Sequence, residues 1–282
     1  MTTRQAITLL KQRLSPLYGD GEATAMTRMA FETYLRWTPV DMVLHEADEL
    51  PPFVSEKMEA VAARVAAGEP IQYVLGVARF HGHNFKVTPA VLIPRPETEQ
   101  LVDLIVSENT GTDLRVLDLG TGSGCIAVSL ARALKFAQVT AVDISEEALA
   151  VACDNAAALK VRVRFERADI LTLRPAPVSL DIVVSNPPYV CRSEAATMEP
   201  HVLRHEPHTA LFVPDDDPLR YYRAIVPLAA AALVPGGRLY LEVNRRYGGE
   251  VASLARGGGF DDVRLLNDFA GNPRFVAAVT PA

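Results

Sequence analysis

The sequence is poor in cysteine, with three residues among 282. Cys125, Cys153 and Cys191 lie far apart and do not have the spacing of a metal site. An odd number of cysteines also argues against a closed disulfide framework, because one thiol would be left over. We therefore expect a protein of a reducing compartment, the cytoplasm.

Long apolar runs and an excess of positive charge are also absent. No run approaches the length of a membrane span, and the first residues lead into an amphipathic pattern rather than the apolar core of a signal peptide. The formal net charge is −6, so no sequence-wide attraction to nucleic acid or anionic lipid is available. We expect a soluble, unexported monomer that does not bind nucleic acid in bulk.

The chain has enough apolar residues, 49% of the total, for one large domain and a small one. From Arg4 to about Ala67 these residues recur at helical spacing, with breaks at residues 19–21 and 51–52. This pattern predicts an N-terminal helical domain over residues 1–70. Residues 71–90, which alternate around Gly76 and Gly82, are predicted to form a β-hairpin linker. The larger domain then covers residues 91–282.

Short β-branched runs alternate with helical stretches in the larger domain. The predicted strands are residues 115–119, 139–142, 161–165, 181–185 and 238–243. The predicted helices lie near residues 126–134, 146–159, 219–233 and 249–255. Residues 263–266 and 275–279 suit a terminal antiparallel hairpin. The fold class is therefore α/β, a Rossmann-like, doubly wound and mostly parallel sheet with its ligand at the carboxyl ends of the strands.

The first of these strands runs into a glycine-rich turn. Gly120, Gly122 and Gly124 let the backbone bend sharply and approach a ligand where a Cβ would intrude. A dinucleotide-binding turn has the pattern G-x-G-x-x-G, but here Cys125 takes the place of the third glycine. The pattern predicts a ligand without a pyrophosphate. A tight strand-to-helix connection with no ligand is the alternative.

Two aspartates follow the next two strands at positions that suit a nucleoside. Asp143 ends its strand where a carboxylate, which only accepts hydrogen bonds, meets ribose hydroxyls. Asp169 is placed to accept from an adenine amino group while Ile170 packs on the ring. Together with the glycine turn, they predict a bound adenosine. A helix N-cap or turn remains an alternative for Asp143, and an ordinary loop position for Asp169.

The fourth strand ends in Asn186-Pro187-Pro188-Tyr189. Two prolines fix φ and remove two backbone N–H donors, which leaves a rigid wall of acceptors. The Asn186 side-chain oxygen and the Pro187 carbonyl can take both hydrogens of a substrate –NH₂ group, while Tyr189 offers a flat face to a planar amide or base. The alternative is that the prolines only end an edge strand and that Tyr189 caps a core.

Such a corner suits methylation of nitrogen. An amide nitrogen is a poor nucleophile because its lone pair is delocalised into the carbonyl. Holding both hydrogens aims the nitrogen and favours the positive charge that develops on it. We therefore predict an enzyme that methylates a planar amide or amine with S-adenosylmethionine as donor, leaving S-adenosylhomocysteine, and that requires no metal.

These motifs resemble those of a known family, the peptide chain release factor N(5)-glutamine methyltransferases, over nearly the whole chain. The glycine turn and Asn-Pro-Pro-Tyr are shared with adenine-N6 DNA methyltransferases and some RNA guanine methyltransferases. Narrower features are GEPIQYVLG (residues 68–76), LIPRPETE (92–99), EPHTAL (206–211) and NDFAGNPRF (267–275).

The resemblance implies a methyltransferase catalytic domain and an N-terminal domain that helps to dock the substrate. The implied cofactor-binding residues are Gly120, Thr121, Gly122, Ser123, Gly124, Asp143, Asp169, Ile170 and Asn186. The implied substrate-binding residues are Asn186, Pro187, Pro188 and Tyr189, of which Asn186, Pro187 and Tyr189 are the catalytic ones. The implied substrate is the glutamine of the Gly-Gly-Gln tripeptide in class-1 release factors.

Other substrates remain as alternatives. A sister family methylates a glutamine of a ribosomal protein, although residues 94–98 look more like the release-factor branch. An exocyclic amine of DNA or RNA would need nearly the same chemistry. However, residues 1–80 carry eight Lys/Arg and ten Asp/Glu, a net charge of −2, which is unlike a nucleic-acid platform. A binding module without activity is the third alternative. We expect a class-1 release factor as partner, with no membrane and no direct nucleic acid.

Two further features have structural interpretations. Residues 94–99 suit the proline-rich start of a helix, with Glu97 and Glu99 favourably placed in its first turn. This interpretation is as acceptable as a catalytic contact. The six histidines lack the spacing of a ligand set, so we expect surface or loop positions and no metal site.

Overall fold

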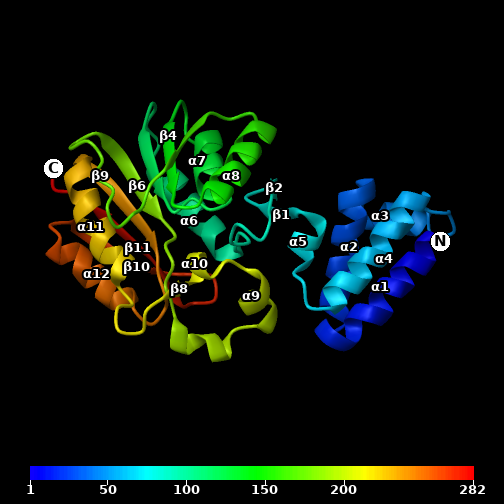
Figure 1. Ribbon diagram of the computed structural model, residues 1–282. Helices are drawn as coiled ribbons and strands as arrows, with labels where there is room; N and C mark the ends of the chain where they lie inside the picture. The colour runs from blue at the N-terminus through cyan, green and yellow to red at the C-terminus, as the bar shows by residue number, and fades with distance from the viewer. The chain divides into compact units, whose positions relative to one another are not determined.

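The computed structural model describes residues 1–282 and separates by its internal contacts into two units (Figure 1). The helical unit comprises Met1–Val77 together with Glu199–His205. The sheet unit comprises Ala78–Met198 and Glu206–Ala282. The division after Val77 falls inside the linker predicted over residues 71–90.

The helical unit is built from short amphipathic helices around a core of its own. Its helices are α1 (Thr3–Tyr18), α2 (Asp20–Leu35), α3 (Pro39–Leu44), α4 (Pro52–Ala66), α5 (Ile71–Leu75) and α9 (Pro200–His205). The predicted breaks are observed, because Gly19 ends α1 with φ of 81° and Pro52 begins α4. Leu10, Phe31 and Met58 are fully buried in the core.

The predicted hairpin linker is wrong in its first part. Residues 71–75 form α5, and the hairpin consists only of β1 (Val77–Phe80) and β2 (His83–Lys86). Gly76 ends α5 in the left-handed conformation, with φ of 71°. A helix of five residues is too short to display its 3.6-residue period, so the apolar Tyr73 and Val74 were compatible with a strand.

The sheet unit contains a seven-stranded sheet in the order β10-β11-β9-β6-β3-β4-β5. Its strands are β3 (Arg115–Leu119), β4 (Gln138–Asp143), β5 (Val163–Arg167), β6 (Leu180–Ser185), β9 (Leu233–Glu242), β10 (Asp261–Asn267) and β11 (Pro273–Val279). Strands β5, β4, β3, β6 and β9 are parallel, while β11 and β10 add the antiparallel hairpin. The predicted doubly wound sheet and terminal hairpin are confirmed.

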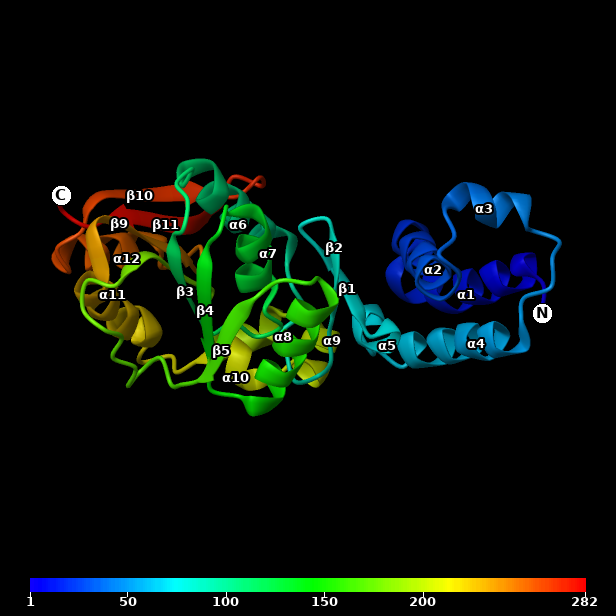
Figure 2. The same cartoon turned by 90° about the horizontal axis from the view of Figure 1, so that it is seen from above.

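Helices cover both faces of this sheet (Figure 2). One face packs against α6 (Pro96–Glu108), α7 (Cys125–Ala133) and α8 (Glu146–Ala158), and the other against α11 (Arg220–Ala232) and α12 (Gly248–Gly257). Side chains alternate between the two faces: Ile182 and Val184 of β6 pack in the core beneath α6, α7 and α8, and Val183 packs in the core beneath α11 and α12. A sheet buried on both faces explains the continuous β-branched runs of the sequence.

The position of β6 excludes one alternative interpretation of the Asn-Pro-Pro-Tyr segment. Strand β6 lies between β9 and β3 in the centre of the sheet, so the prolines do not end an edge strand. The strand bounds otherwise differ from those predicted by a few residues, chiefly at β9, which begins at Leu233 rather than at residue 238. The Asn-Pro-Pro-Tyr segment therefore leaves the sheet at the same edge at which the other predicted site residues follow β3, β4 and β5.

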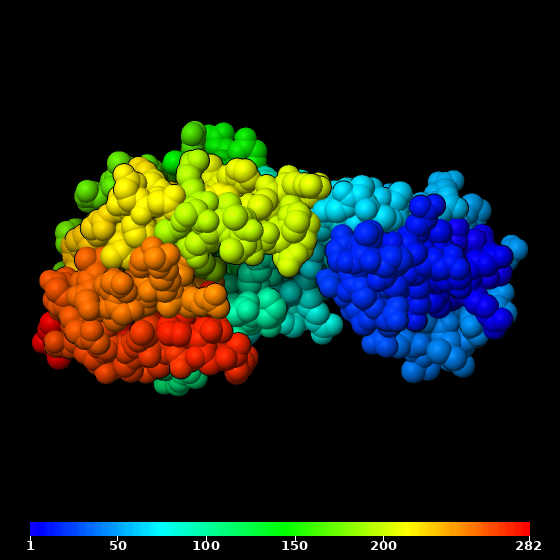
Figure 3. All heavy atoms as spheres, turned by 90° about the horizontal axis from the view of Figure 1, so that it is seen from below, coloured from blue at the N-terminus to red at the C-terminus, as the bar shows by residue number.

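Shorter elements follow β6 that the sequence did not indicate. They are β7 (Val190–Cys191), the 3₁₀ helix η1 (Arg192–Thr197), α10 (His208–Leu211) and β8 (Phe212–Val213), with β7 and β8 paired in parallel. In Figure 3 the surface of the sheet unit continues over α11, α12 and the terminal hairpin, coloured yellow to red. None of the helices is both long and apolar enough to cross a bilayer.

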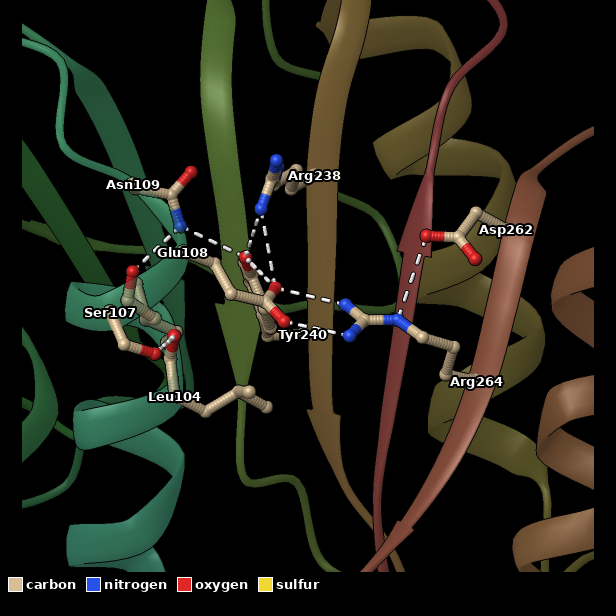
Figure 4. A network of polar contacts seen from close by, with 9 residues as sticks. Leu104, Ser107, Glu108, Asn109, Arg238, Tyr240, Asp262 and Arg264 are labelled. Atoms are coloured by element: carbon tan, nitrogen blue, oxygen red, sulfur yellow. Dashed lines mark hydrogen bonds and ion pairs between the residues drawn. The ribbon is translucent and has the colours of Figure 1, made fainter.

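A polar network joins the end of α6 to the antiparallel part of the sheet (Figure 4). Glu108 accepts a hydrogen bond from the Tyr240 hydroxyl at 2.8 Å and forms ion pairs with Arg238 and Arg264. Burial alone would raise the pKa of Glu108, but the hydrogen bonds from Arg264 and Tyr240 and the positive charges of Arg264 and Arg238 together lower it. The network holds α6, and with it the residues at the start of α6, against the sheet.

Candidate active site

A cavity opens at the carboxyl ends of β3, β4 and β6. It measures about 130 Å³, roughly ten times the 10–15 Å³ that one water needs, so it has room for a small ligand. The residues that line it include Gly120, Thr121, Gly122, Ser123, Asp143, Asp169, Ile170, Asn186 and Pro188, together with Leu92, Pro94, Arg95, Thr98, Pro207, Thr209 and Ala210. Most of the predicted site residues therefore share one cavity, whereas Gly124, Pro187 and Tyr189 do not line it.

The glycine turn bends as its sequence predicts. Gly120, Gly122 and Gly124 have φ of 74°, 54° and 78°, values that other residues rarely adopt. A Cβ on Gly124 would lie 3.0 Å from that of Ala152 in α8. Gly124 therefore allows α7 and α8 to pack closely, while the backbone of residues 120–123 faces the cavity.

Asp143 ends β4 and holds the glycine turn in place. Its carboxylate accepts hydrogen bonds from the backbone N–H of Gly122 at 2.9 Å and of Ser145 at 3.0 Å. The N-cap of α8 is Ser145, whose hydroxyl accepts from the N–H of Ala148 at 3.1 Å. Asp143 is thus not the helix cap, although its bond from Ser145 is a turn of the kind that aspartates form, and each of its oxygens keeps a lone pair for a ligand in the cavity.

Asp169 and Ile170 lie together in the cavity wall after β5. The Oδ1 atom of Asp169 accepts from the N–H of Leu171 at 2.9 Å, a turn of the kind that loop aspartates form. Its Oδ2 atom accepts no hydrogen bond within the chain. Ile170 is 7% exposed, and a Cβ on Gly120 would lie 3.4 Å from its Cδ1 atom. The turn interpretation of Asp169 and its place in the cavity wall are therefore both correct.

The Asn-Pro-Pro-Tyr segment presents acceptors. Asn186 and Pro188 line the cavity, and the carbonyls of Asn186, Pro187 and Pro188 accept no hydrogen bond within the chain. Tyr189 lies behind this wall, where its hydroxyl donates to Glu242 at 3.1 Å and its carbonyl accepts from Asn244 at 3.1 Å. The role of Tyr189 as a flat face for the substrate stays a prediction.

A buried hydrogen-bond chain supports Asn186. Its Nδ2 atom donates to the Thr98 hydroxyl at 3.3 Å, and that hydroxyl donates to Glu242 at 2.7 Å. Glu242 is 1% exposed. Burial raises the pKa of Glu242, although the Thr98 hydrogen bond, the positive charge of Arg274 and the Tyr189 hydrogen bond act in the opposite direction. Burial and the charge of Glu242 raise the pKa of Tyr189, so its hydroxyl keeps its proton.

A second acidic side chain is buried below the glycine turn. Asp118 is 0% exposed and accepts a hydrogen bond from the Thr121 hydroxyl at 2.6 Å. Burial is the main cause that raises the pKa of Asp118 to about 7, and the negative charge of Asp143 adds to it. This carboxyl therefore titrates near neutral pH.

An ion pair joins two further segments that line the cavity. The buried Glu206 accepts from the Arg95 guanidinium at 2.5 Å and from the backbone N–H of Ile93 at 3.2 Å. It thereby ties residues 92–99 to residues 206–211. The helix start predicted at residues 94–99 is confirmed, because α6 begins at Pro96 with Glu97 and Glu99 in its first turn.

The sequence had not indicated roles for Arg95, Thr98, Glu206 or Glu242. Arg95 and Thr98 lie in a segment that had been noted, but their partners are 111 and 144 residues away along the chain. A local sequence pattern cannot indicate a contact between residues so far apart along the chain. In addition, no group of three or more His, Cys, Asp or Glu side chains that could hold a metal ion occurs.

The chain is similar to known proteins in parts of its sequence and over nearly its whole length. Residues 116–203 match the family described as methyltransferase domain, and residues 5–76 match the PrmC N-terminal domain. The release factor glutamine methyltransferase of Bacteroides thetaiotaomicron is 44% identical over 95% of this chain and 97% of its own. Those of Cereibacter sphaeroides and Bordetella pertussis are 42% and 39% identical, over 94% and 95% of this chain and 94% and 98% of their own.

Solved structures share the fold at lower identity. A methyltransferase from Pyrococcus furiosus is 17% identical, with a TM-score of 0.53 over 78% of this chain and 98% of its own. This likeness supports the methyltransferase fold.

Proposed function

Because the chain belongs to the release factor glutamine methyltransferases, we propose that it methylates the side-chain nitrogen of the glutamine in the Gly-Gly-Gln tripeptide of class-1 release factors. The donor is S-adenosylmethionine. The observation that carries the proposal is the acceptor corner: Asn186 and Pro188 line the same cavity as the glycine turn, and the carbonyl of Pro187 between them accepts no hydrogen bond within the chain.

The cavity fits an adenosine-containing donor. Gly120 and Gly122 leave room for a ligand close to the backbone, since a Cβ on Gly122 would meet nothing within 4 Å. Asp143 can accept from both ribose hydroxyls, and the Oδ2 atom of Asp169 can accept from the adenine amino group. Ile170 provides an apolar surface for the ring. These residues would hold the donor, whose sulfonium supplies an electrophilic methyl group and keeps the electron pair of the broken C–S bond.

The protein's own part in the reaction is positioning. The Asn186 side-chain oxygen and the Pro187 carbonyl accept the two N–H groups of the glutamine amide, and thereby aim its nitrogen into the cavity. Two fixed dipoles with their negative ends toward the nitrogen favour the positive charge that develops there. After transfer the nitrogen loses one proton to water.

The remaining properties follow from charge and cysteine chemistry. We propose that the enzyme acts as a monomer in the cytoplasm and makes no direct contact with nucleic acid. The three free cysteines support the cytoplasm, and the net charge of −6 supports the lack of contact with nucleic acid.

The test is peptide mapping by mass spectrometry of a class-1 release factor incubated with enzyme and donor. We expect a gain of about 14 Da on the tripeptide glutamine. A release factor with that glutamine changed to glutamate is the matched control and should gain nothing. An unmodified wild-type release factor, or a gain on another residue, would refute the proposal.

Parallel assays test the two alternative substrates, a ribosomal-protein glutamine and an exocyclic amine of nucleic acid. Modification of a ribosomal-protein glutamine in preference to the release factor would assign the chain to the sister activity. Binding to duplex DNA that weakens steeply with salt, together with methylated adenine or guanine, would instead show a nucleic-acid enzyme.

A further inference from the structure

The hydrogen bonds around Glu242 have a defined direction. A carboxylate only accepts, and a threonine hydroxyl has a single hydrogen to donate. Glu242 receives that hydrogen from Thr98 at 2.7 Å and a second one from the Tyr189 hydroxyl at 3.1 Å. Burial raises the pKa of Glu242, whereas these two hydrogen bonds and the positive charge of Arg274 favour its charged form. The Thr98 oxygen is therefore left with lone pairs only.

This direction determines how the Asn186 amide lies. Its –NH₂ group donates to the Thr98 oxygen at 3.3 Å, and so its Oδ1 atom points the other way. Turning the amide over would set Oδ1 against the Thr98 oxygen, two acceptors with no hydrogen between them. The buried carboxylate thus selects one of the two amide orientations through a single hydroxyl.

The selected orientation matters because Asn186 lines the cavity. With its oxygen toward the substrate, Asn186 accepts from an –NH₂ group. With its nitrogen toward the substrate, it would donate, which suits a carboxylate oxygen instead. Glutamine and glutamate have nearly the same shape and differ in this property.

We infer that Thr98 and Glu242 are positioning residues that hold the Asn186 oxygen toward the substrate, so that the site takes the amide of glutamine and rejects the carboxylate of glutamate. The inference rests on the proposed function, and it deepens that function by naming the residues that distinguish a substrate glutamine from a glutamate. Thr98 lies at the start of α6 and Glu242 at the end of β9, so the selection depends on how α6 packs against the sheet.

Replacing Thr98 by valine tests the inference at nearly constant shape. The –NH₂ group of Asn186 would then face a methyl group, and the amide is expected to turn it toward the cavity instead. The loss of one polar contact of this kind changes a rate or binding constant by about 10- to 100-fold. We expect kcat to fall by about that factor with unchanged affinity for S-adenosylmethionine, and Tm to be lower because the buried Glu242 loses a hydrogen bond. Thr98→Ser restores the hydroxyl and should recover most of the activity.

Binding without the donor provides a second readout. Calorimetry gives the ratio of Kd for the release factor with glutamate to that with glutamine at the tripeptide. We expect this ratio to shrink about 10-fold or more in Thr98→Val and to be restored in Thr98→Ser. Thr140→Val, on β4 and with no side-chain hydrogen bond in the chain, is the control and should match wild type.

The outcomes separate the inference from the proposed function. No methylation by the wild-type enzyme would refute the proposed function. Methylation by wild type and equal kcat and Kd ratio in Thr98→Val would refute only the positioning role. Equal impairment in Thr98→Ser and Thr98→Val would also refute it, because the methyl group rather than the hydroxyl would then matter.

Discussion

The buried carboxyl of Asp118 gives a prediction about stability and pH. The side chain is 0% exposed and receives one side-chain hydrogen bond, from Thr121. Its pKa rises from 3.8 to about 7 on folding. At about 1.4 kcal/mol for each tenfold change in proton affinity, the charged carboxyl costs the folded state up to about 4 kcal/mol.

The sign follows from the direction of this change. Because the folded state holds the proton more tightly than the unfolded state, Asp118 favours folding at low pH, and this contribution is lost as pH rises through about 7. Asparagine has nearly the same shape and stays neutral at every pH. The free energy of unfolding of wild type minus that of Asp118→Asn should therefore fall by about 3 kcal/mol between pH 5 and pH 8.

The assay is urea unfolding of both proteins at pH 5, 6, 7 and 8 in one buffer series. All other titrating groups are common to the two proteins and cancel in the difference. Asp216→Asn, at an exposed position without a hydrogen bond, controls for the loss of one carboxylate. A difference that stays constant across the series would refute the reasoning, because the carboxyl would then ionise as in the unfolded chain.

Three further predictions concern the site and the sheet. Asn186→Ala should reduce turnover by about 100-fold or more in a steady-state assay while calorimetry shows nearly unchanged donor affinity, and the reverse pattern would contradict its assigned role. Asp143→Ala should weaken donor binding by about 10-fold or more, chiefly through the ribose, and an unchanged Kd would contradict that contact. Tyr240→Phe removes the hydrogen bond to Glu108 at 2.8 Å and should lower the free energy of unfolding by about 1 kcal/mol, measured in urea. No loss would show that solvent replaces the bond.

The sequence predicted the sheet and its ligand end well because those features are encoded locally. A β-branched run, a glycine turn and a helical period all lie within a few residues, and β3 has the predicted bounds. Asp143 and Asn186 could be placed because residues that end parallel strands meet at one edge. The short helix α5 was missed for the same reason, since five residues carry too little period.

The supporting residues could not be predicted because their meaning is tertiary. Thr98 is an ordinary residue of a first helical turn until Glu242 and Asn186 are seen on either side of it. Gly124 is the opposite case. We attributed its lack of a side chain to the ligand, but a Cβ at this position would instead meet Ala152. Local sequence therefore identifies the site residues, while the packing of α6 against β9 determines the orientation of the Asn186 amide.

The central claim is that Asn186 and Pro187 accept the two hydrogens of the substrate amide. A crystal structure of the enzyme with S-adenosylhomocysteine and a peptide containing Gly-Gly-Gln measures this directly. We expect the glutamine Nε2 atom at about 3 Å from both the Asn186 Oδ1 atom and the Pro187 carbonyl oxygen. A glutamine bound elsewhere, or an Asn186 whose nitrogen faces it, would contradict the account.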